Sequence, residues 1–388
     1  MKNSLPIVLG ALAIYLFSTG ISFAFFSWNK GSSETIVAPV SESITPGEGF
    51  KIDPALPKTE TCPLNGKLYS KPEKALWETR RPLAVMIENH TEARPQSGLS
   101  KADVVYEAVA EGGITRFLGV FYCGISENTD FAPVRSARTY YLDWVSEYDG
   151  LYNHVGGAGK CNDPTVASKA KALCQIDQYG IKDMDQFGIS FPDCYRNPDR
   201  LVNHPVATEH QMVCLSDNLY KIAEERGWTN VDEKSISWDE NFVSWKFKKE
   251  EDLDKRGATA KIDLYFWTGY KEYEVTWEYN QEKNVYKRLN GGLPHLDLLT
   301  NSQITAKNVL VQFVKETGPV DEHKHMLYGT IGTGEALVFQ DGNVTKGRWS
   351  KKNRVSRTFF YDEKGKEISF NPGEIWIEAV PSGNEVTY

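Results

Sequence analysis

The clearest indication of the fold is the stretch RPLAVMIENHTEARPQSGLSKADVVYEAVAEGGITRFLGVFY at residues 81–122. They contain three mainly apolar runs, at 83–87, 102–110 and 114–122, and the last run begins directly after Gly112-Gly113. Apolar runs of this length, bounded by glycine, are typical of strands that are buried on both faces of a sheet. The stretch therefore predicts a sheet with a well-covered core.

Helices are expected to alternate with further strands after this stretch. Apolar side chains have helical spacing over 136–148, with Ser136 as the expected N-cap and Asp149-Gly150 as the stop. Residues 151–155 predict a short strand that ends at Gly156-Gly157. Further helices are expected at 165–174 and 212–226. This mixture of strands and helices predicts an α/β domain with a mixed sheet over residues 62–230.

The rest of the chain, residues 231–388, has a different character. Its apolar segments are short and rich in Trp and Tyr, and they alternate with polar residues and turn-like sequences. Strands are expected at 236–245, 260–267, 272–279, 285–289, 302–315, 326–330, 336–339, 355–361 and 374–380. The pattern predicts a mostly antiparallel β domain.

The N-terminus predicts a membrane anchor. Residues 5–28 carry no charge, and this run of 24 residues is long enough for a helix that spans a bilayer, which needs roughly 20. A cleaved signal peptide is the alternative, but bulky Phe25 and Phe26 follow Ala24, where a cleavage site needs small residues. We therefore expect residues 1–4 in the cytoplasm, one uncleaved transmembrane helix and a flexible linker over 29–61. Residues 29–388 would then lie outside the cytoplasm.

An even number of cysteines after an export segment predicts disulfides. The six cysteines are Cys62, Cys123, Cys161, Cys174, Cys194 and Cys214. Of the 15 possible pairings the sequence selects none, although the short closures 161–174 and 194–214 are favoured. A zinc site is the alternative, but no two cysteines have C-x-x-C spacing. The net charge of −8 lacks the basic footprint of a nucleic-acid-binding protein, so no nucleic-acid partner is expected.

Three long motifs carry a resemblance to a known family. They are residues 81–121, APVRSARTYYLDWVSEYDGLYNHVGGA at 132–158 and the segment 339–381, from FQDGN to WIEAVP, and together they resemble the YerB-like family of exported bacterial proteins. The resemblance covers roughly residues 62–388 and implies an N-terminal domain and a smaller C-terminal domain. The function of that family is unknown, and its members are often lipoproteins. This chain differs because its hydrophobic anchor has no cysteine for lipid attachment.

The segment Arg135-Ser136-Ala137-Arg138 is the strongest candidate site. If Ser136 caps a helix, the free N–H groups of the first turn and the two arginines would together bind a phosphate or carboxylate. Arg94 and Arg116 would join this site if their loops meet at the same end of the sheet, where open α/β sheets bind ligands. The alternative is that the arginines form internal salt bridges with Asp103, Glu107 or Glu111.

Other residues are candidates for catalysis or ligand contact. Asp103 and Glu107 could assist proton transfer or bind magnesium, and His154 could act as a base. Gly156 and Gly157 would let a ligand approach the backbone, but a plain turn is the favoured explanation. Glu107 and Glu111 together could also do acid–base work or hold a metal ion. The alternative is that they lie on a surface that is solvated or paired with arginine.

Two polar segments in the second half are further candidates. Asp321, His323 and His325 would share one face of a strand and resemble a partial zinc site, but the segment is also loop-like. A basic run has two interpretations, contact with anionic polymer or lipid, or the solvated tip of a hairpin. Its residues are Lys346, Arg348, Lys351, Lys352, Arg354 and Arg357. No metal or other cofactor is assigned from the sequence.

The sequence leaves three functional hypotheses. The first is a membrane-anchored envelope protein that binds an anionic polymer or lipid-linked ligand through arginines. The second is a phosphotransferase that is loosely similar to the LytR-CpsA-Psr enzymes and acts on polyprenyl-pyrophosphate-linked polymers, with magnesium as the possible cofactor. The third is a scaffold whose aromatic β-rich half binds a protein partner.

Overall fold

A computed structural model of the chain describes residues 52–202 and 204–388. These described residues pack as one compact unit. The predicted transmembrane segment 5–28 lies outside the described residues. Among the helices that the structure does describe, none is long and apolar enough to cross a membrane.

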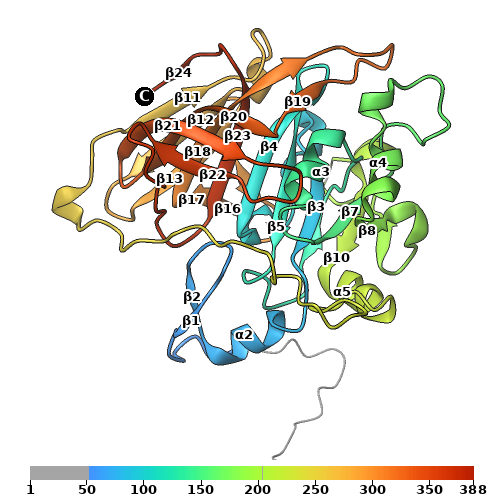
Figure 1. Cartoon of the computed structure of the whole chain (residues 1–388), viewed down its shortest axis with the longest axis horizontal. Coiled ribbons are helices and arrows are strands. Elements are labelled where there is room, and N and C mark those ends of the chain that lie inside the picture. The colour runs from blue at the N-terminus through green and yellow to red at the C-terminus, as the bar shows by residue number, and fades with distance from the viewer. Residues whose placement is uncertain (1–51, 203) are drawn as a thin grey trace, which may run out of the picture. The chain divides into compact units, whose positions relative to one another are not determined.

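A large mixed sheet of eleven strands forms the centre of the fold (Figure 1). Its main path runs β22 (Phe359–Asp362), β21 (Asn343–Lys351), β20 (Gly332–Gln340), β18 (Asn308–Thr317), β23 (Ile375–Pro381), β4 (Val104–Glu111), β5 (Ile114–Phe121), β3 (Leu83–Glu88), β7 (Leu151–His154) and β8 (Lys182–Asp185), and β19 (Leu327–Gly329) pairs with β18. Strands β3, β4 and β5 are almost wholly buried. The structure therefore confirms the three strands that their apolar runs predict.

The two halves of the chain contribute to this sheet side by side. Strand β23, from the end of the chain, pairs in parallel with β4, as the red and cyan arrows at the centre of Figure 1 show. The α/β and β-rich halves that the sequence predicts are thus both present, and they share one sheet. Their junction is a row of backbone hydrogen bonds between central strands.

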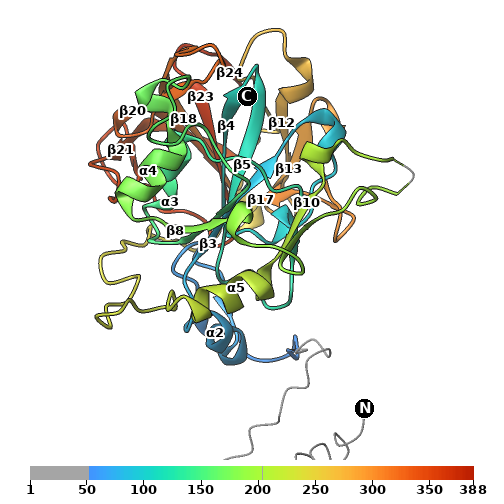
Figure 2. The ribbon, with the colours of Figure 1, turned by 90° about the vertical axis from the view of Figure 1, so that its right-hand side faces the viewer.

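A second, six-stranded sheet packs against one face of the large sheet. It contains β14 (Leu293–Pro294), β13 (Val285–Asn290), β12 (Val275–Asn280), β11 (Lys261–Leu264), β24 (Val386–Thr387) and β17 (Thr305–Ala306). Helix α3 (Thr139–Val145) covers the other face, where Trp144 stacks on Tyr106 of β4. Because side chains alternate along a strand, Tyr106 faces α3 and Glu107 faces the second sheet. Figure 2 shows α3 and α4 (Ala172–Tyr179) on the side away from β12 and β13.

Small elements close the remaining edges. Helix α2 (Lys71–Trp77) follows a hairpin of β1 (Glu60–Thr61) and β2 (Leu68–Tyr69), and helix α5 is Ser216–Glu225. A three-stranded sheet contains β6 (Asp130–Phe131), β10 (Met212–Leu215) and β9 (Cys194–Arg196), and β15 (Leu296–Asp297) pairs with β16 (Ser302–Gln303).

Three predicted helices have different bounds in the structure. Helix α3 begins at Thr139 and not at Ser136, because Ala137 is held in a parallel bridge with Gly157. The segment 165–174 is helical only in a 3-10 turn and at the start of α4. Residues 212–215 form strand β10, because they pair with β9, and only then does α5 begin. In each case a contact that is distant in sequence overrides a local helical pattern.

Two predicted strands in the second half are also wrong or shortened. Residues 236–245 form no strand, because Trp238 and Trp245 are buried individually among loops. The predicted strand 355–361 is reduced to β22, since Arg357 and Thr358 instead form polar contacts with Glu147. The pairing of the remaining strands there is mostly antiparallel, as predicted, with β18 and β23 as the parallel exception.

All six cysteines form disulfides, as their number predicts. The pairs are Cys62–Cys123, Cys161–Cys174 and Cys194–Cys214, so both favoured short closures are confirmed. The alternative of a cysteine zinc site is excluded because no described cysteine is free. Three disulfides are typical of proteins that fold in an oxidising compartment outside the cytoplasm.

Candidate functional site

Charged side chains gather where several strands of the large sheet end. Strands β3, β4 and β7 run in the same direction, so their carboxyl ends meet at one edge, where open α/β sheets bind ligands. Glu88 ends β3, Glu111 ends β4 and Arg116 lies near the start of the antiparallel β5. The loop before α3 adds Arg135 and Arg138. We call these five residues the carboxyl-edge cluster.

Two arginines of this cluster converge on one carboxylate. An Nη2 atom of Arg116 lies 3.1 Å from Oε2 of Glu111, and Arg138 forms an ion pair with the other oxygen. Both arginine side chains are buried, whereas 27% of the Glu111 side chain is exposed. Arg116 also donates to the carbonyl oxygen of Ser136 at 3.1 Å, which fixes its direction. Arg116 and Arg138 therefore form a fork that holds one anionic group near the surface, and we call this pair the Arg fork.

Glu88 is the second carboxylate of the cluster, and it is buried. It pairs with Arg135, and its carboxylate also lies 4.0 Å from Arg116 and 3.7 Å from Nδ1 of His210. Burial by itself would raise the pKa of Glu88, but His210, Arg116 and Arg135 outweigh it and lower that pKa to about 2. Glu88 therefore remains charged and neutralises part of the arginine charge.

Several buried nitrogen atoms in the cluster and beside it lack a hydrogen-bond partner among the described residues. They are Nε of Arg116, Nε of Arg138 and Nδ1 of His210. Burial also lowers the pKa of Arg138. Unpaired buried donors cost free energy, so they commonly indicate a role other than stability.

Two predicted members of the site occupy other positions. Ser136 is not a helix cap, and α3 begins with no side-chain cap, so the expected set of free N–H groups next to Ser136 is wrong. Arg94 donates to the backbone and side-chain oxygens of Asn89 at 3.0–3.2 Å and stacks on Tyr273. The structure thus places Arg94 outside the Arg fork.

The strand end at His154 and the glycines after it serve internal contacts. His154 is buried, and its ring nitrogens lie 2.8 Å from the carbonyl oxygen of Gly156 and from Oδ1 of Asp183. The Gly156 amide donates to Asp185 at 2.8 Å, so it is occupied. A side chain at Gly157 would lie 3.1 Å from Ala137. These contacts favour a structural role for the glycine pair.

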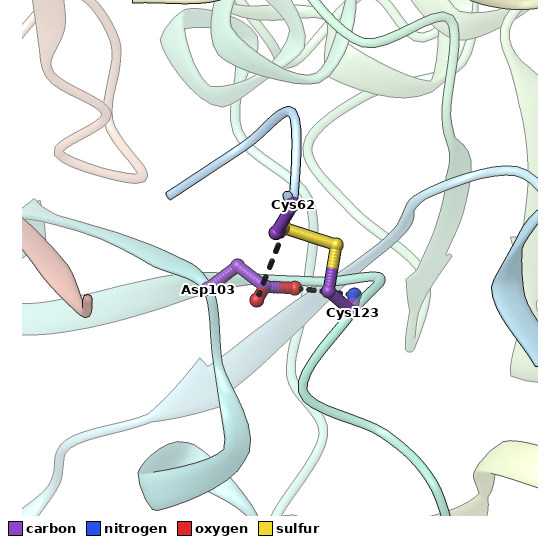
Figure 3. Close-up of side chains that lie close together, drawn as sticks. All are labelled: Cys62, Asp103 and Cys123. Atoms are coloured by element: carbon purple, nitrogen blue, oxygen red, sulfur yellow. Dashed lines mark hydrogen bonds between the residues drawn. A yellow bond between two sulfur atoms is a disulfide. The ribbon is translucent and has the colours of Figure 1, made fainter. Parts of the chain in front are cut away.

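Asp103 lies at the opposite end of β4 from Glu111. Its carboxylate is buried beside the Cys62–Cys123 disulfide and accepts a hydrogen bond from the backbone N–H of Cys123 at 2.9 Å (Figure 3). The backbone N–H of Tyr122 donates to the same carboxylate at 2.7 Å. Sγ of Cys62 lies 3.9 Å from Asp103, but this sulfur is in a disulfide and offers no thiolate to a metal. Asp103 is therefore distant from the Arg fork.

Glu107 is also separated from the fork, because it lies on the other face of the sheet. It pairs there with Arg288 of β13, and both side chains are fully buried. The salt-bridge alternative thus holds for Glu111, while Glu107 pairs with an arginine that the sequence did not single out.

The two polar segments of the second half form structural contacts. Residues 321–323 lie in a turn, not a strand, and Asp321 binds His325 and the backbone of Ala167. The basic run lies on β21 and in the loop that joins it to β22, with which β21 forms an antiparallel hairpin. It is only partly solvated, because Lys351 and Arg357 are buried against Glu147, at 2.7 and 2.9 Å.

Sequence reasoning missed Glu88, His210 and Arg288. Glu88 carried a usable signal, since a charged residue directly follows a buried apolar run at a strand end. His210 and Arg288 carried none, because their partners lie far away in the sequence.

The fold and the disulfides define a mixed α/β protein with a β-rich second half. The chain belongs to the DUF3048 family, whose two domain models match its two halves. The model for "Protein of unknown function (DUF3048) N-terminal domain" matches residues 66–229, and the model for the C-terminal domain matches residues 262–377. The resemblance to the YerB-like family is thereby confirmed.

A particular relative is the "Putative lipoprotein YerB" of Bacillus subtilis (strain 168). It is 29% identical over 331 residues, which cover 84% of this chain and 88% of YerB. The crystal structure of YerB from Bacillus subtilis matches with a TM-score of 0.68 at 26% identity, and it covers 85% of this chain and 100% of the YerB chain.

Proposed function

We propose that this chain is an exported, membrane-associated protein of the cell envelope that binds a phosphate- or carboxylate-bearing ligand at the Arg fork. The disulfides, the uncharged segment 5–28 and a relative that is named a lipoprotein support the location. In this proposal residues 5–28 span the membrane once and residues 29–388 lie outside the cytoplasm.

The convergence of Arg116 and Arg138 on one partly exposed carboxylate carries the binding proposal. Two guanidinium groups around one anion are a strong, geometrically specific receptor for carboxylate or phosphate. Glu111 occupies this receptor from within the chain, at the turn before Gly112 and Gly113. A ligand anion would therefore compete with Glu111 for the same donors, and Arg135 would add charge at the rim.

The competition makes a sharp test possible. The full chain, purified in detergent, would be titrated with polyprenyl pyrophosphate and separately with an anionic wall polymer, each with and without magnesium. We expect Glu111→Gln to bind the anion more tightly than the unchanged chain, because it removes the internal competitor. Arg138→Ala should abolish anion binding. The control is Arg348→Ala, which removes an exposed arginine on β21 and should leave anion binding unchanged.

The result against the proposal is equally clear. If neither the unchanged chain nor Glu111→Gln binds either ligand while both remain folded, the arginines are structural ion-pair partners. The scaffold hypothesis would then be preferred. Binding only in the presence of magnesium would direct further assays to phosphate transfer.

A further inference from the structure

His90, Glu92 and His210 bring three metal-type ligand atoms within 4.8 Å of one another. His90 and Glu92 come from the turn after β3, and His210 ends a 3-10 turn, Thr208–His210, about a hundred residues later in the chain. We infer that these three side chains form a binding site for a divalent transition-metal ion of the zinc type. This inference does not rest on the Arg fork, because none of the three residues belongs to that pair.

The donor set fits such an ion. Imidazole nitrogen suits zinc, copper and nickel, and a carboxylate oxygen completes a common three-ligand arrangement. Three protein ligands leave at least one coordination position for water or for an anionic oxygen atom. Calcium and magnesium prefer sets made of oxygen atoms alone, so they fit this set poorly.

The two histidines are held in place before any ion binds. Their rings stack with centroids 4.8 Å apart and an angle of 20° between the planes. Nδ1 of His90 accepts the backbone N–H of Glu92 at 3.3 Å, which ties these two ligands together. These contacts restrict the positions of the ligands, and an ion would draw the three ligand atoms, which lie within 4.8 Å of one another, closer together.

Arg200 joins the two segments that carry the ligands. Its buried guanidinium donates to the carbonyl oxygen of His210 at 2.8 Å and to that of Pro95 at 3.1 Å, and it also contacts the carbonyl oxygen of Ala93. Since Ala93 ends the turn that begins after His90, one side chain fixes both sides of the site.

His210 itself has the features of an oriented metal ligand. It is 4% exposed, and its Nδ1 has no hydrogen-bond partner among the described residues. This atom faces Oε2 of Glu88 at 3.7 Å. A carboxylate behind a histidine is the usual outer partner that orients the ring and raises its basicity toward a metal.

The charges around the site are balanced. Glu88, Glu92 and Glu209 provide three carboxylates in this region, and the nearby cations are Arg116 and Arg135, which pair with Glu88, and Arg200, which donates to the carbonyl oxygen of His210. Glu92 is the carboxylate that would contact the ion directly. Because Arg135 and His210 share Glu88, the metal site and the carboxyl-edge cluster adjoin each other.

Zinc binding by the full chain tests the inference. The chain would be purified in detergent without a polyhistidine tag, stripped with a chelator and titrated with zinc chloride alone by calorimetry. Cobalt absorption would report nitrogen ligation. We expect one zinc per chain, with an affinity that falls about tenfold or more in His90→Ala and in Glu92→Gln.

Two controls separate zinc binding at this site from zinc binding elsewhere on the chain. The first is His323→Ala, which removes an exposed histidine far along the sequence and should bind zinc like the unchanged chain. The second is Arg138→Ala, which should lose anion binding but keep zinc binding. His210 is buried, so His210→Ala serves only if circular dichroism shows an intact fold. The inference is wrong if the unchanged chain takes up no zinc, or if His90→Ala and Glu92→Gln bind zinc like the unchanged chain.

Discussion

Glu107 of β4 and Glu378 of β23 are register partners on adjacent parallel strands, and both carboxyl groups are completely buried. Arg288 is the basic group beside them, paired with Glu107 and 3.9 Å from Glu378. The indole N–H of Trp277 donates to Glu378 at 2.9 Å. Burial, and then the charge of Glu107, raise the pKa of Glu378 well above its ordinary value. Arg288 thus neutralises Glu107, while Glu378 keeps its proton.

This pair predicts an asymmetry between two identical substitutions. Glu378→Gln should change the free energy of unfolding by less than about 1 kcal/mol, because an amide resembles a protonated carboxyl and still accepts from Trp277. Glu107→Gln should cost about 3–5 kcal/mol, because it leaves Arg288 buried without a charged partner. Urea unfolding at pH 7 measures both. Equal losses in the two variants would contradict the assignment of the proton to Glu378.

Substitutions of two adjacent lysines in the basic run should have very different effects on the free energy of unfolding. Lys351 is buried on Glu147, whereas Lys352 is exposed. Lys351→Met should lower the free energy of unfolding by about 3 kcal/mol or more, since it disrupts a buried ion pair. Lys352→Met should change it by no more than about 0.5 kcal/mol. Thermal and urea unfolding measure both, and similar effects in the two variants would show that the run is solvated.

Asp103 should give the folded chain a stability that falls with rising pH. Burial raises the pKa of Asp103 to about 7 despite its backbone hydrogen bonds, compared with 3.8 as the ordinary value. Between about pH 4 and 7 the folded state therefore holds a proton that the unfolded state has lost. Stability then decreases with pH by at most about 1.4 kcal/mol per unit. Urea unfolding from pH 4.5 to 7.5 measures this slope.

Asp103→Asn should remove that contribution to the slope. The matched control is Asp254→Asn, which changes an exposed aspartate and should leave the slope as it is. A slope that is unchanged in Asp103→Asn would mean that the hydrogen bonds from Tyr122 and Cys123 keep the carboxylate charged.

Glu88 should act in the opposite direction at lower pH. Its pKa is about 2 in the folded chain, below the ordinary value of 4.5, so its charged form stabilises the fold fully above about pH 4.5. This stabilisation should be lost as the pH falls from about 4.5 towards 2. Glu88→Gln should cost about 3–5 kcal/mol at pH 7 and flatten the acid limb.

Unfolding between pH 2 and 5 measures the effect of Glu88→Gln. Glu127→Gln is the control, because Glu127 makes only an exposed ion pair with Lys101, and such pairs contribute little. An acid limb as steep in Glu88→Gln as in the unchanged chain would refute the role of Glu88.

Features that depend on neighbouring residues could be predicted from the sequence. The apolar runs around 83–87, 102–110 and 114–122 became β3, β4 and β5, because a continuous apolar segment has to be buried wherever it lies. The even number of cysteines predicted disulfides, because their number and spacing can be read directly from the sequence. The clustering of Arg116 with Arg138 followed from the rule that ligand groups meet at strand ends.

Contacts between segments that are distant in the sequence could not be predicted and are known from the packed structure. The pairing of β23 with β4 joins residues more than 250 positions apart, and no local pattern encodes that register. Ser136 lost its expected role because Ala137 is held by Gly157, and His210 meets His90 because Arg200 joins their loops. Propensity and spacing act over a few residues, whereas backbone pairing and buried charge depend on the whole packed chain. The partners of the buried charged side chains therefore could not be predicted from the sequence.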